Sequence, residues 1–467
     1  MFGSTILDKC FKGFGFKKIL FGASIIAGMS MSLAPQAQAT SLEEAIRLSL
    51  EHNPRVSIVA RNKEAVVEEL RQARGLYLPT VDMTSGVGFE QTSTPTIRSG
   101  NNDDQEDLVA LDASLSVSQR LFDGFERSSR VDRQMARIQS AANRVYENSE
   151  VLALDVIGSY LEVIRQRELL ALSRENVAFH VQTLEALVKR LRAGVGSRAD
   201  VVQTQARLAR ARATYVDTNN DLADAEAEYT RLVGQFPGDL VLPEVPQNTL
   251  PTTMEELVRL ASTNNPTVKV READAKVANL DVDVAEAVFY PQISLQGTTS
   301  YDEDADGVNS YTYQNALGLR MNWNLFNGGT DVATRQELLM REEQAKGERF
   351  DAVLEAEEEA RRSWFAWLAS QQRLQELSSS VVFNQETRLA YERQFQVGQR
   401  TLLDVLDAEN ELFTSRGQLI SADINQMRAS YRMLANVGEL LKTLNISAPL
   451  QVDGSAESFG ESIGFRN

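Results

Sequence analysis

The chain of 467 residues contains one pattern twice, and this duplication limits its possible folds more than any other feature. The segment 41–48 (SLEEAIRL) recurs at 253–260 as TMEELVRL, and Gly194 in the first copy matches Gly398 in the second. Each copy opens with a capping box, in which a Ser or Thr precedes a Glu by three residues, and this pattern marks a helix start. We therefore expect one structural unit that is built twice.

The repeats also predict domain boundaries. We assign residues 40–236 to the first repeat and residues 253–446 to the second. The segment 237–252 between them holds four of the eleven prolines and is interpreted as a linker. Residues 447–467 are interpreted as a C-terminal tail.

The distribution of proline predicts very long helices. No proline occurs from 96 to 236 or from 292 to 448. Only isolated glycines interrupt the helical pattern of 126–192 and 330–396, and some 65 residues at 1.5 Å each give rods roughly 100 Å long. Each rod is followed by a second helix with apolar residues at every seventh position, which is typical of a coiled coil. The helices alone would favour a soluble helical bundle or coiled-coil scaffold.

Four further segments alternate apolar and polar residues with a period of two, as strands with one apolar and one polar face do. They form two predicted β-hairpins, at about 79–121 and 291–325, with strands long enough to cross a bilayer. A sheet packed on a soluble core would show the same alternation, but these hairpins are inserted between helices too long for a compact domain. Four strands cannot close without edges, and lipid does not tolerate open edges, so several chains must contribute to one barrel.

Aromatic residues are predicted to mark the ends of these strands that lie away from the polar hairpin loops. Such residues form an interfacial girdle in membrane proteins. The predicted girdle consists of Tyr77, Phe122, Phe289, Tyr290 and Phe326.

Residues 1–39 have the features of a secretory signal peptide. Lysines precede an apolar run, and Ala37-Gln38-Ala39 forms a small-residue cleavage signal. An uncleaved membrane anchor is the alternative, although the apolar run is short for a membrane span. We therefore expect an exported protein.

Composition excludes several classes of function. Cys10 is the only cysteine, and His52 and His180 are the only histidines, so disulfides and most metal or nucleophile–histidine sites are difficult to assemble. The net charge of −17 argues against a nucleic-acid partner held by bulk electrostatics. We expect no cofactor, no metal and no nucleic acid.

The duplicated unit, the turn LFNGG at 325–329 and the segment VGQRTLLDVLDA at 397–408 resemble the TolC family of outer-membrane channels. The resemblance covers about residues 41–445. It implies a mainly α protein with a membrane β-barrel portion, built from long coiled-coil-like helices and four transmembrane β-strands per chain. The implied assembly is a homotrimer, with twelve strands in the outer membrane of a Gram-negative bacterium and a helical tunnel in the periplasm.

The resemblance also implies a gate at the periplasmic end. Asp404 and Asp407 match the carboxylates that ring the constriction, where they would favour cations and raise some carboxylate pKa values by repulsion. Arg400 matches the gate arginine, and Asp200 matches the aspartate that it bonds across the helix pair. Phe395 stands where the family often has a tyrosine, so one gate hydrogen bond is absent. From spacing alone, the alternative is that the two aspartates are solvated acids on an exposed helix.

We expect a passive, non-enzymatic exit duct whose energy comes from an inner-membrane transporter, of ABC type or proton-driven, through a periplasmic adaptor. Type I secretion is favoured because the chain lacks the lipid-anchor cysteine frequent in dedicated drug-efflux members. The alternatives are the outer-membrane component of a tripartite drug or toxin efflux pump and, in another class, a soluble periplasmic coiled-coil adaptor. A hydrolase using Asp404 and Asp407 lacks a recognisable third group.

Overall fold

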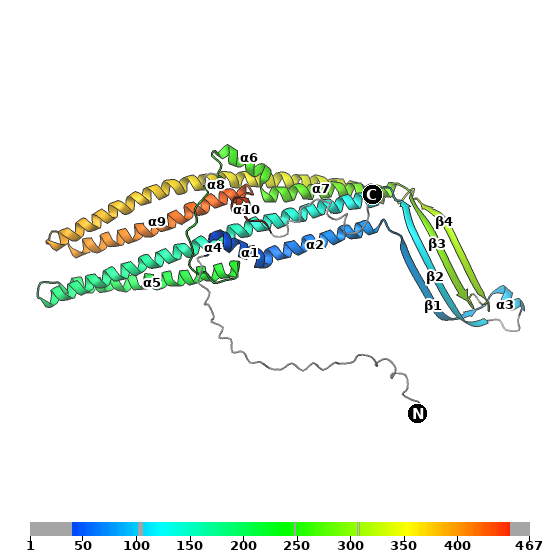
Figure 1. Ribbon diagram of the computed structural model, residues 1–467, viewed down its shortest axis with the longest axis horizontal. Helices are drawn as coiled ribbons and strands as arrows, with labels where there is room; N and C mark the ends of the chain where they lie inside the picture. Colours follow the sequence, from blue (N-terminus) through cyan, green and yellow to red (C-terminus); the bar gives the residue numbers. More distant parts are fainter. Residues whose placement is uncertain (1–39, 101–105, 247–248, 306, 308, 449–467) are drawn as a thin grey trace, which may run out of the picture. The chain divides into compact units, whose positions relative to one another are not determined.

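The computed structural model describes residues 40–100, 106–246, 249–305, 307 and 309–448. The predicted signal peptide and nearly all of the predicted tail lie outside the described residues. Both halves of the chain share the order helix, helix, strand, strand, long helix, long helix, and each half carries additional short helical segments of its own (Figure 1). The internal duplication and the mainly helical class with four antiparallel strands are therefore confirmed.

The first half contains a pair of short helices, a hairpin of strands and two long helices. These elements are α1 (Leu42–His52), α2 (Pro54–Gly75), β1 (Thr80–Thr92), α3 (Pro95–Gly100), β2 (Glu106–Phe122), α4 (Glu126–Arg192) and α5 (Arg198–Val233). The second half repeats them, without a counterpart of α3 among the described residues, as α6 (Met254–Asn264), α7 (Pro266–Glu286), β3 (Gln292–Glu303), β4 (Tyr311–Asn322), α8 (Thr330–Gln396) and α9 (Leu402–Asn436). It adds the 3₁₀ turn η2 (Ala287–Phe289) before β3 and the short helix α10 (Leu440–Thr443) after α9.

The predicted helix starts are confirmed, but the capping boxes are only half formed. Ser41 and Thr253 each accept a hydrogen bond from the N–H three residues later, at 3.2 Å. The carboxylate of Glu256 reaches one residue further back than expected and accepts the N–H of Thr252 at 3.1 Å. The reciprocal pair of bonds forms instead at Thr401 and Asp404, at the start of α9.

The long helix α4 is the centre of the helical portion. It packs against α5, α7, α2 and α9. The largest cluster of buried side chains surrounds its Tyr160 and includes Tyr229, Tyr431 and Ile46 from three other helices. The Tyr160 hydroxyl accepts the N–H of Val241 at 3.0 Å, so the segment between the two halves is bonded to the core. A buried tyrosine retains such a partner because an unmade hydrogen bond is costly.

The four strands form one antiparallel sheet in the order β1-β2-β3-β4. Its register places apolar residues opposite apolar residues, for example Val81 opposite Val117 and Val87 opposite Leu111. Polar residues likewise face one another, and Ser114 lies opposite Thr84 on one side and Ser300 on the other. One face of the sheet is therefore apolar and the other polar. The outer edges of β1 and β4 have no partner strand among the described residues.

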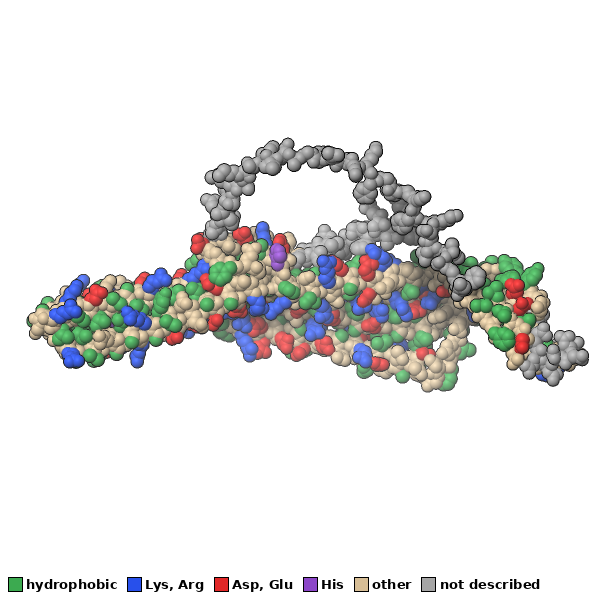
Figure 2. All heavy atoms as spheres, turned by 90° about the horizontal axis from the view of Figure 1, so that it is seen from below, with side chains coloured by type: hydrophobic (Ala, Val, Ile, Leu, Met, Phe, Trp, Pro, Cys, Tyr) green, Lys and Arg blue, Asp and Glu red, His purple; other side chains and the backbone are tan. Residues whose placement is uncertain are grey.

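The apolar face of the sheet is exposed. Val87, Phe89, Leu317 and Leu319 are each at least 70% exposed. Hydrophobic side chains gather over the strands in Figure 2, whereas charged side chains are spread over the helices. Among the described helices, none is both long enough and apolar enough to cross a membrane.

Candidate functional site

Two regions carry the predicted site residues, and they lie at opposite ends of the long helices. The first, which we call the tip, comprises residues 187–207 between α4 and α5 and residues 391–408 between α8 and α9. Gly194 and Gly398 end the long helices with φ of 77° and 78°, a left-handed conformation that glycine adopts without strain. Because α4 is 67 residues long, about 100 Å of helix separates this turn from the strands.

At the tip, Asp404 caps its own helix. Its Oδ2 accepts hydrogen bonds from the Thr401 N–H at 3.0 Å and the Thr401 hydroxyl at 2.8 Å. Arg400 lies 3.8 Å from the other carboxylate oxygen. The bonds from Thr401, supported by the charge of Arg400, hold the pKa of Asp404 below its usual range in the single chain.

Asp407 is bound to the other hairpin. Its Oδ1 accepts a hydrogen bond from Nη2 of Arg207, on α5, at 2.7 Å. The Asp407 side chain is 57% exposed, so this ion pair lies at the surface. His180, on α4, is buried, and burial together with the charge of Arg207 lowers its pKa. The two aspartates, three residues apart, therefore have different partners.

Arg400 bonds within its own hairpin. Its Nε donates to Oε1 of Gln394 at 3.1 Å, and its guanidinium lies 4.3 Å from the ring centre of Tyr391. Asp200 is in the first turn of α5. Within the part of the chain that the structure describes, no ion pair joins Arg400 to Asp200, so that contact stays an expectation for the assembled protein.

Phe395 packs between the two hairpins. The guanidinium carbon of Arg190, on α4, lies 5.4 Å from the centre of its ring. The ring also packs against a cluster of buried apolar side chains from three helices. This cluster consists of Leu187, Val201, Leu402 and Leu406.

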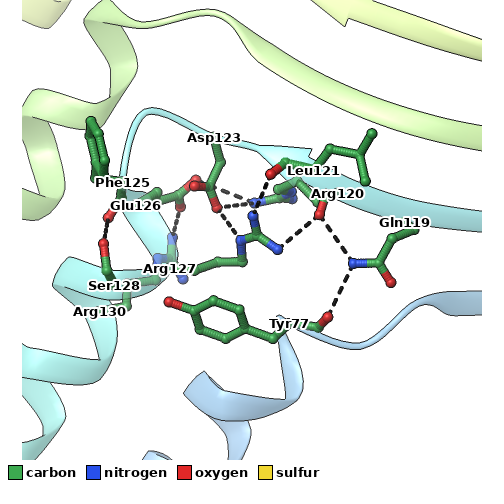
Figure 3. A network of polar contacts seen from close by, with 10 residues as sticks. All are labelled: Tyr77, Gln119, Arg120, Leu121, Asp123, Phe125, Glu126, Arg127, Ser128 and Arg130. Carbon is green, nitrogen blue, oxygen red and sulfur yellow. Dashed lines mark hydrogen bonds and ion pairs between the residues drawn. The ribbon is translucent and has the colours of Figure 1, made fainter. Parts of the chain in front are cut away.

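The second region is the junction between the strands and the long helices, and Figure 3 shows its polar network. Arg127, at the start of α4, donates to the buried carboxylate of Asp123 at 2.6 Å and to the carbonyl oxygen of Arg120 at 2.9 Å. Its guanidinium lies 4.8 Å from the ring centre of Tyr77, and the Gln119 amide donates to the Tyr77 carbonyl at 3.1 Å. These contacts tie β2 and the end of α2 to α4.

The turn that precedes α4 depends on one glycine. Gly124 has φ of 66°, and a Cβ there would lie 2.6 Å from the carbonyl oxygen of Ala287. Phe125, which follows, also has a positive φ, 70°. Its counterpart in the second copy is Gly329, with φ of 85°. A phenylalanine therefore occupies a backbone conformation that the second copy gives to glycine.

Phe125 connects two of the predicted girdle residues. Its ring makes edge-to-face contacts with Phe122 at 5.7 Å and with Tyr290 at 6.2 Å between centroids. Such geometry is favourable for aromatic pairs. Trp323 donates its indole N–H to the carbonyl oxygen of Phe289 at 3.2 Å.

Tyr77, Phe289 and Tyr290 are 40–48% exposed, and Phe326 is 83% exposed. The five predicted residues therefore lie around the strand ends at this junction, but Phe326 has no ring contact among the described residues.

The family described as "Outer membrane efflux protein" matches residues 45–235 and 257–439, one stretch in each half. The chain belongs to this family.

Similar proteins cover almost the whole chain. An "Outer membrane efflux protein BepC" of Brucella suis biovar 1 is 23% identical over 431 residues, 91% of each chain. The "Alkaline protease secretion protein AprF" of Pseudomonas aeruginosa is 23% identical over 430 residues, 90% of this chain and 88% of its own. An "Outer membrane protein TolC" of Vibrio cholerae is 23% identical over 433 residues, 90% of this chain and 96% of its own. The predicted resemblance to the TolC family is therefore confirmed.

The solved structure of the outer-membrane channel OprN has the same fold. It superposes with a TM-score of 0.72 at 19% identity, covering 85% of this chain and 89% of that chain. Outer membrane efflux proteins are transport channels and not enzymes, and their helical portion lies in the periplasm. This membership assigns the chain to the outer membrane and sets aside the adaptor and the hydrolase as alternatives.

Several contacts of this efflux protein were not found from its sequence. Arg190 and Arg207 are two of many arginines on the first hairpin, and no local pattern distinguishes them. The buried pair of Asp123 and Arg127 has an i,i+4 spacing, which was the one available signal. Phe125 could have been noticed because it follows the Leu-Phe-Asp-Gly turn at 121–124.

Proposed function

We propose that three copies of this chain form the outer-membrane exit duct of a type I secretion system. The observation that carries the proposal is the sheet, which has one exposed apolar face and two unpaired edges. Backbone groups at an open edge cannot remain unpaired in lipid. Edge-to-edge pairing of three sheets would give a closed cylinder of twelve strands with the apolar face toward lipid.

The tip supports a gate in this duct. Asp404 and Asp407 would contribute six carboxylates from three chains to a narrow lumen, and such a ring favours cations. Arg400, Asp200 and Phe395 would then belong to the contacts that close the tip. The five aromatic residues at the junction would lie at the periplasmic surface of the membrane. The repeat boundaries at 40–236 and 253–446 belong to the same proposal.

The duct would need partners in the cell envelope. An inner-membrane transporter, of ABC type or proton-driven, and a periplasmic adaptor would supply the energy and open the tip. AprF, by its name a protease secretion protein, supports secretion as the function. BepC, by its name an efflux protein, is 23% identical over a similar length and supports a tripartite drug or toxin efflux pump as the second candidate.

Deletion of the coding sequence in its host tests the choice. Loss of a secreted protein from the medium, with unchanged drug susceptibility, is expected for a secretion duct. Increased susceptibility to drugs with an unchanged set of secreted proteins would instead support the efflux pump as the function.

A second experiment tests the gate. A chromosomal copy that carries Asp404→Ala and Asp407→Ala should restore transport but give channels that divalent cations block less. Unchanged block of the purified channel would contradict the gate assignment.

A further inference from the structure

The polar face of the sheet carries arginines toward the long helices and a pair of aspartates toward the hairpin loops. Asp112 lies directly opposite Asp302. Arg120 and Arg320 both lie opposite Ser294, one on either side of it. Eight residues separate the two rows along β3, which corresponds to about 27 Å. This separation exceeds the Debye length at physiological ionic strength, so the arginines act on a solute separately from these aspartates.

Arg320 is the arginine whose charge is available. It is exposed on β4 and makes no hydrogen bond or ion pair among the described residues. Arg120, in contrast, lies 3.3 Å from a carboxylate oxygen of Glu126 and 4.0 Å from one of Asp123. On the polar face, the row nearest to Arg320 that contains an acid is that of Asp82, four residues or about 13 Å along the strands.

The surroundings of Arg320 leave space for a ligand. Ser294 faces it on β3, and Gly318 is its neighbour on the same face of β4. A Cβ at Gly318 would meet no atom within 4 Å, so the surface beside the guanidinium is open. A guanidinium presents its N–H donors in a fork that matches the two oxygens of a carboxylate. The site therefore offers a charge, a geometry and room for an acidic side chain.

We propose that Arg320 forms a carboxylate-binding ring at the helix end of the twelve-stranded cylinder and that acidic segments of an exported polypeptide bind there in passage. The inference rests on the proposed function, because three copies place three such guanidiniums around one lumen. Pores that select anions use rings of arginine or lysine in this way. The ring is opposite in sign to the carboxylates of the proposed gate, so the duct contains two charged rings in series.

Single-channel recording of the full-length protein in a planar lipid bilayer tests the ring. The probe is a hexaglutamate peptide, added on the side of the hairpin loops, from which the cylinder is reached without passing the tip. We expect reversible block of the original protein and at least a fivefold higher half-blocking concentration for Arg320→Gln. Arg320→Lys keeps the charge without the fork and should lie between the two. Arg120→Gln should weaken the block less, because Arg120 already has carboxylate partners.

The matched control is Arg361→Gln, which removes the same charge from an exposed position on α8. Arg361 is paired with Glu357 and lies about 45 Å of helix away from the strands. We expect its block to equal that of the original protein. Equal weakening by Arg361→Gln and Arg320→Gln would assign the block to overall charge and overturn the ring.

Two further outcomes would also overturn the inference. One is unchanged block of Arg320→Gln in oligomers of normal size. The other is block by inorganic tripolyphosphate without block by hexaglutamate, which would exclude carboxylates as the ligand. An original protein that forms no channel would instead overturn the proposed function, so the two failures are distinguishable.

Discussion

Glu150 of α4 is a buried acid whose charge the fold accommodates poorly. Only 2% of the residue is exposed. One carboxylate oxygen accepts the N–H of Leu441 at 3.2 Å. Burial raises its pKa to about 7. The folded protein therefore keeps this proton between its ordinary pKa of 4.5 and about 7, whereas the unfolded chain has lost it.

The contribution of Glu150 to the free energy of unfolding should consequently be largest below about pH 4.5 and should decline as the pH rises to about 7. Glu150→Gln keeps an acceptor for Leu441 without a charge. We expect the variant to be more stable than the original protein at pH 8 by between about 1 and 3 kcal/mol. The variant and the original protein should have similar stability at pH 4.5. Melting temperatures at the two pH values, with the exposed Glu51→Gln as control, check this. Equal pH dependence of the two proteins would contradict it.

At the junction, Arg127 compensates a charge that is almost completely buried. Asp123 is 3% exposed, and Arg127 is its closest cation, at 2.6 Å. Arg127→Met should lower the free energy of unfolding by about 3 kcal/mol, because it leaves a buried carboxylate largely uncompensated. Arg130→Met removes a half-exposed partner of Glu126, at 2.6 Å, and should cost less than about 1 kcal/mol. Denaturant unfolding of both variants measures the difference, and equal losses would refute the role of Arg127.

At the scale of whole elements, local signals were sufficient for the long helices and the strands, but they did not predict the short helix α3. The predicted rods at 126–192 and 330–396 coincide with α4 and α8 because proline and glycine end helices through their own backbone. The alternation of apolar and polar residues predicted which side chains share each face of a strand. The contacts at the tip were beyond such reasoning. Arg207 meets Asp407 only because the hairpin α4–α5 and the hairpin α8–α9 lie side by side at this level, and no repeat within a single helix specifies that arrangement.

Introducing a charged residue should reduce membrane assembly on one face of the sheet and leave it nearly unchanged on the other. Val87 is 74% exposed on the apolar face near the middle of β1, and Thr84 lies on the polar face at a similar depth. Val87→Arg should reduce assembly in the membrane by the equivalent of about 2 to 4 kcal/mol, because the cation would face lipid. Thr84→Arg loses a bond to Ser114 but should assemble nearly normally. The assembled fraction in outer-membrane extracts, separated without heating, compares them. Equal assembly of both would mean that the apolar face does not meet lipid.

At the scale of the whole molecule, the unpaired edges β1 and β4 should meet in neighbouring copies. Because the strands alternate, only positions on the same face can come close across that pairing. The sole cysteine of the chain is Cys10, so introduced thiols can be read without interference from any other part of residues 40–467. This makes the edge pairing measurable by disulfide formation.

Gln314→Cys in β4 should therefore form a disulfide with a cysteine on the polar face of β1, tested one position at a time at Asp82, Thr84 and Gly86. Under oxidation, the best pair should give covalent dimers and trimers on a denaturing gel and nothing larger, since a ring of three copies has three junctions between sheets. The pair of Tyr313→Cys and Thr84→Cys, on opposite faces, should remain monomeric. Bands beyond the trimer would indicate an open row of sheets or a larger ring. No covalent product at any of the three positions would show that the edges do not pair.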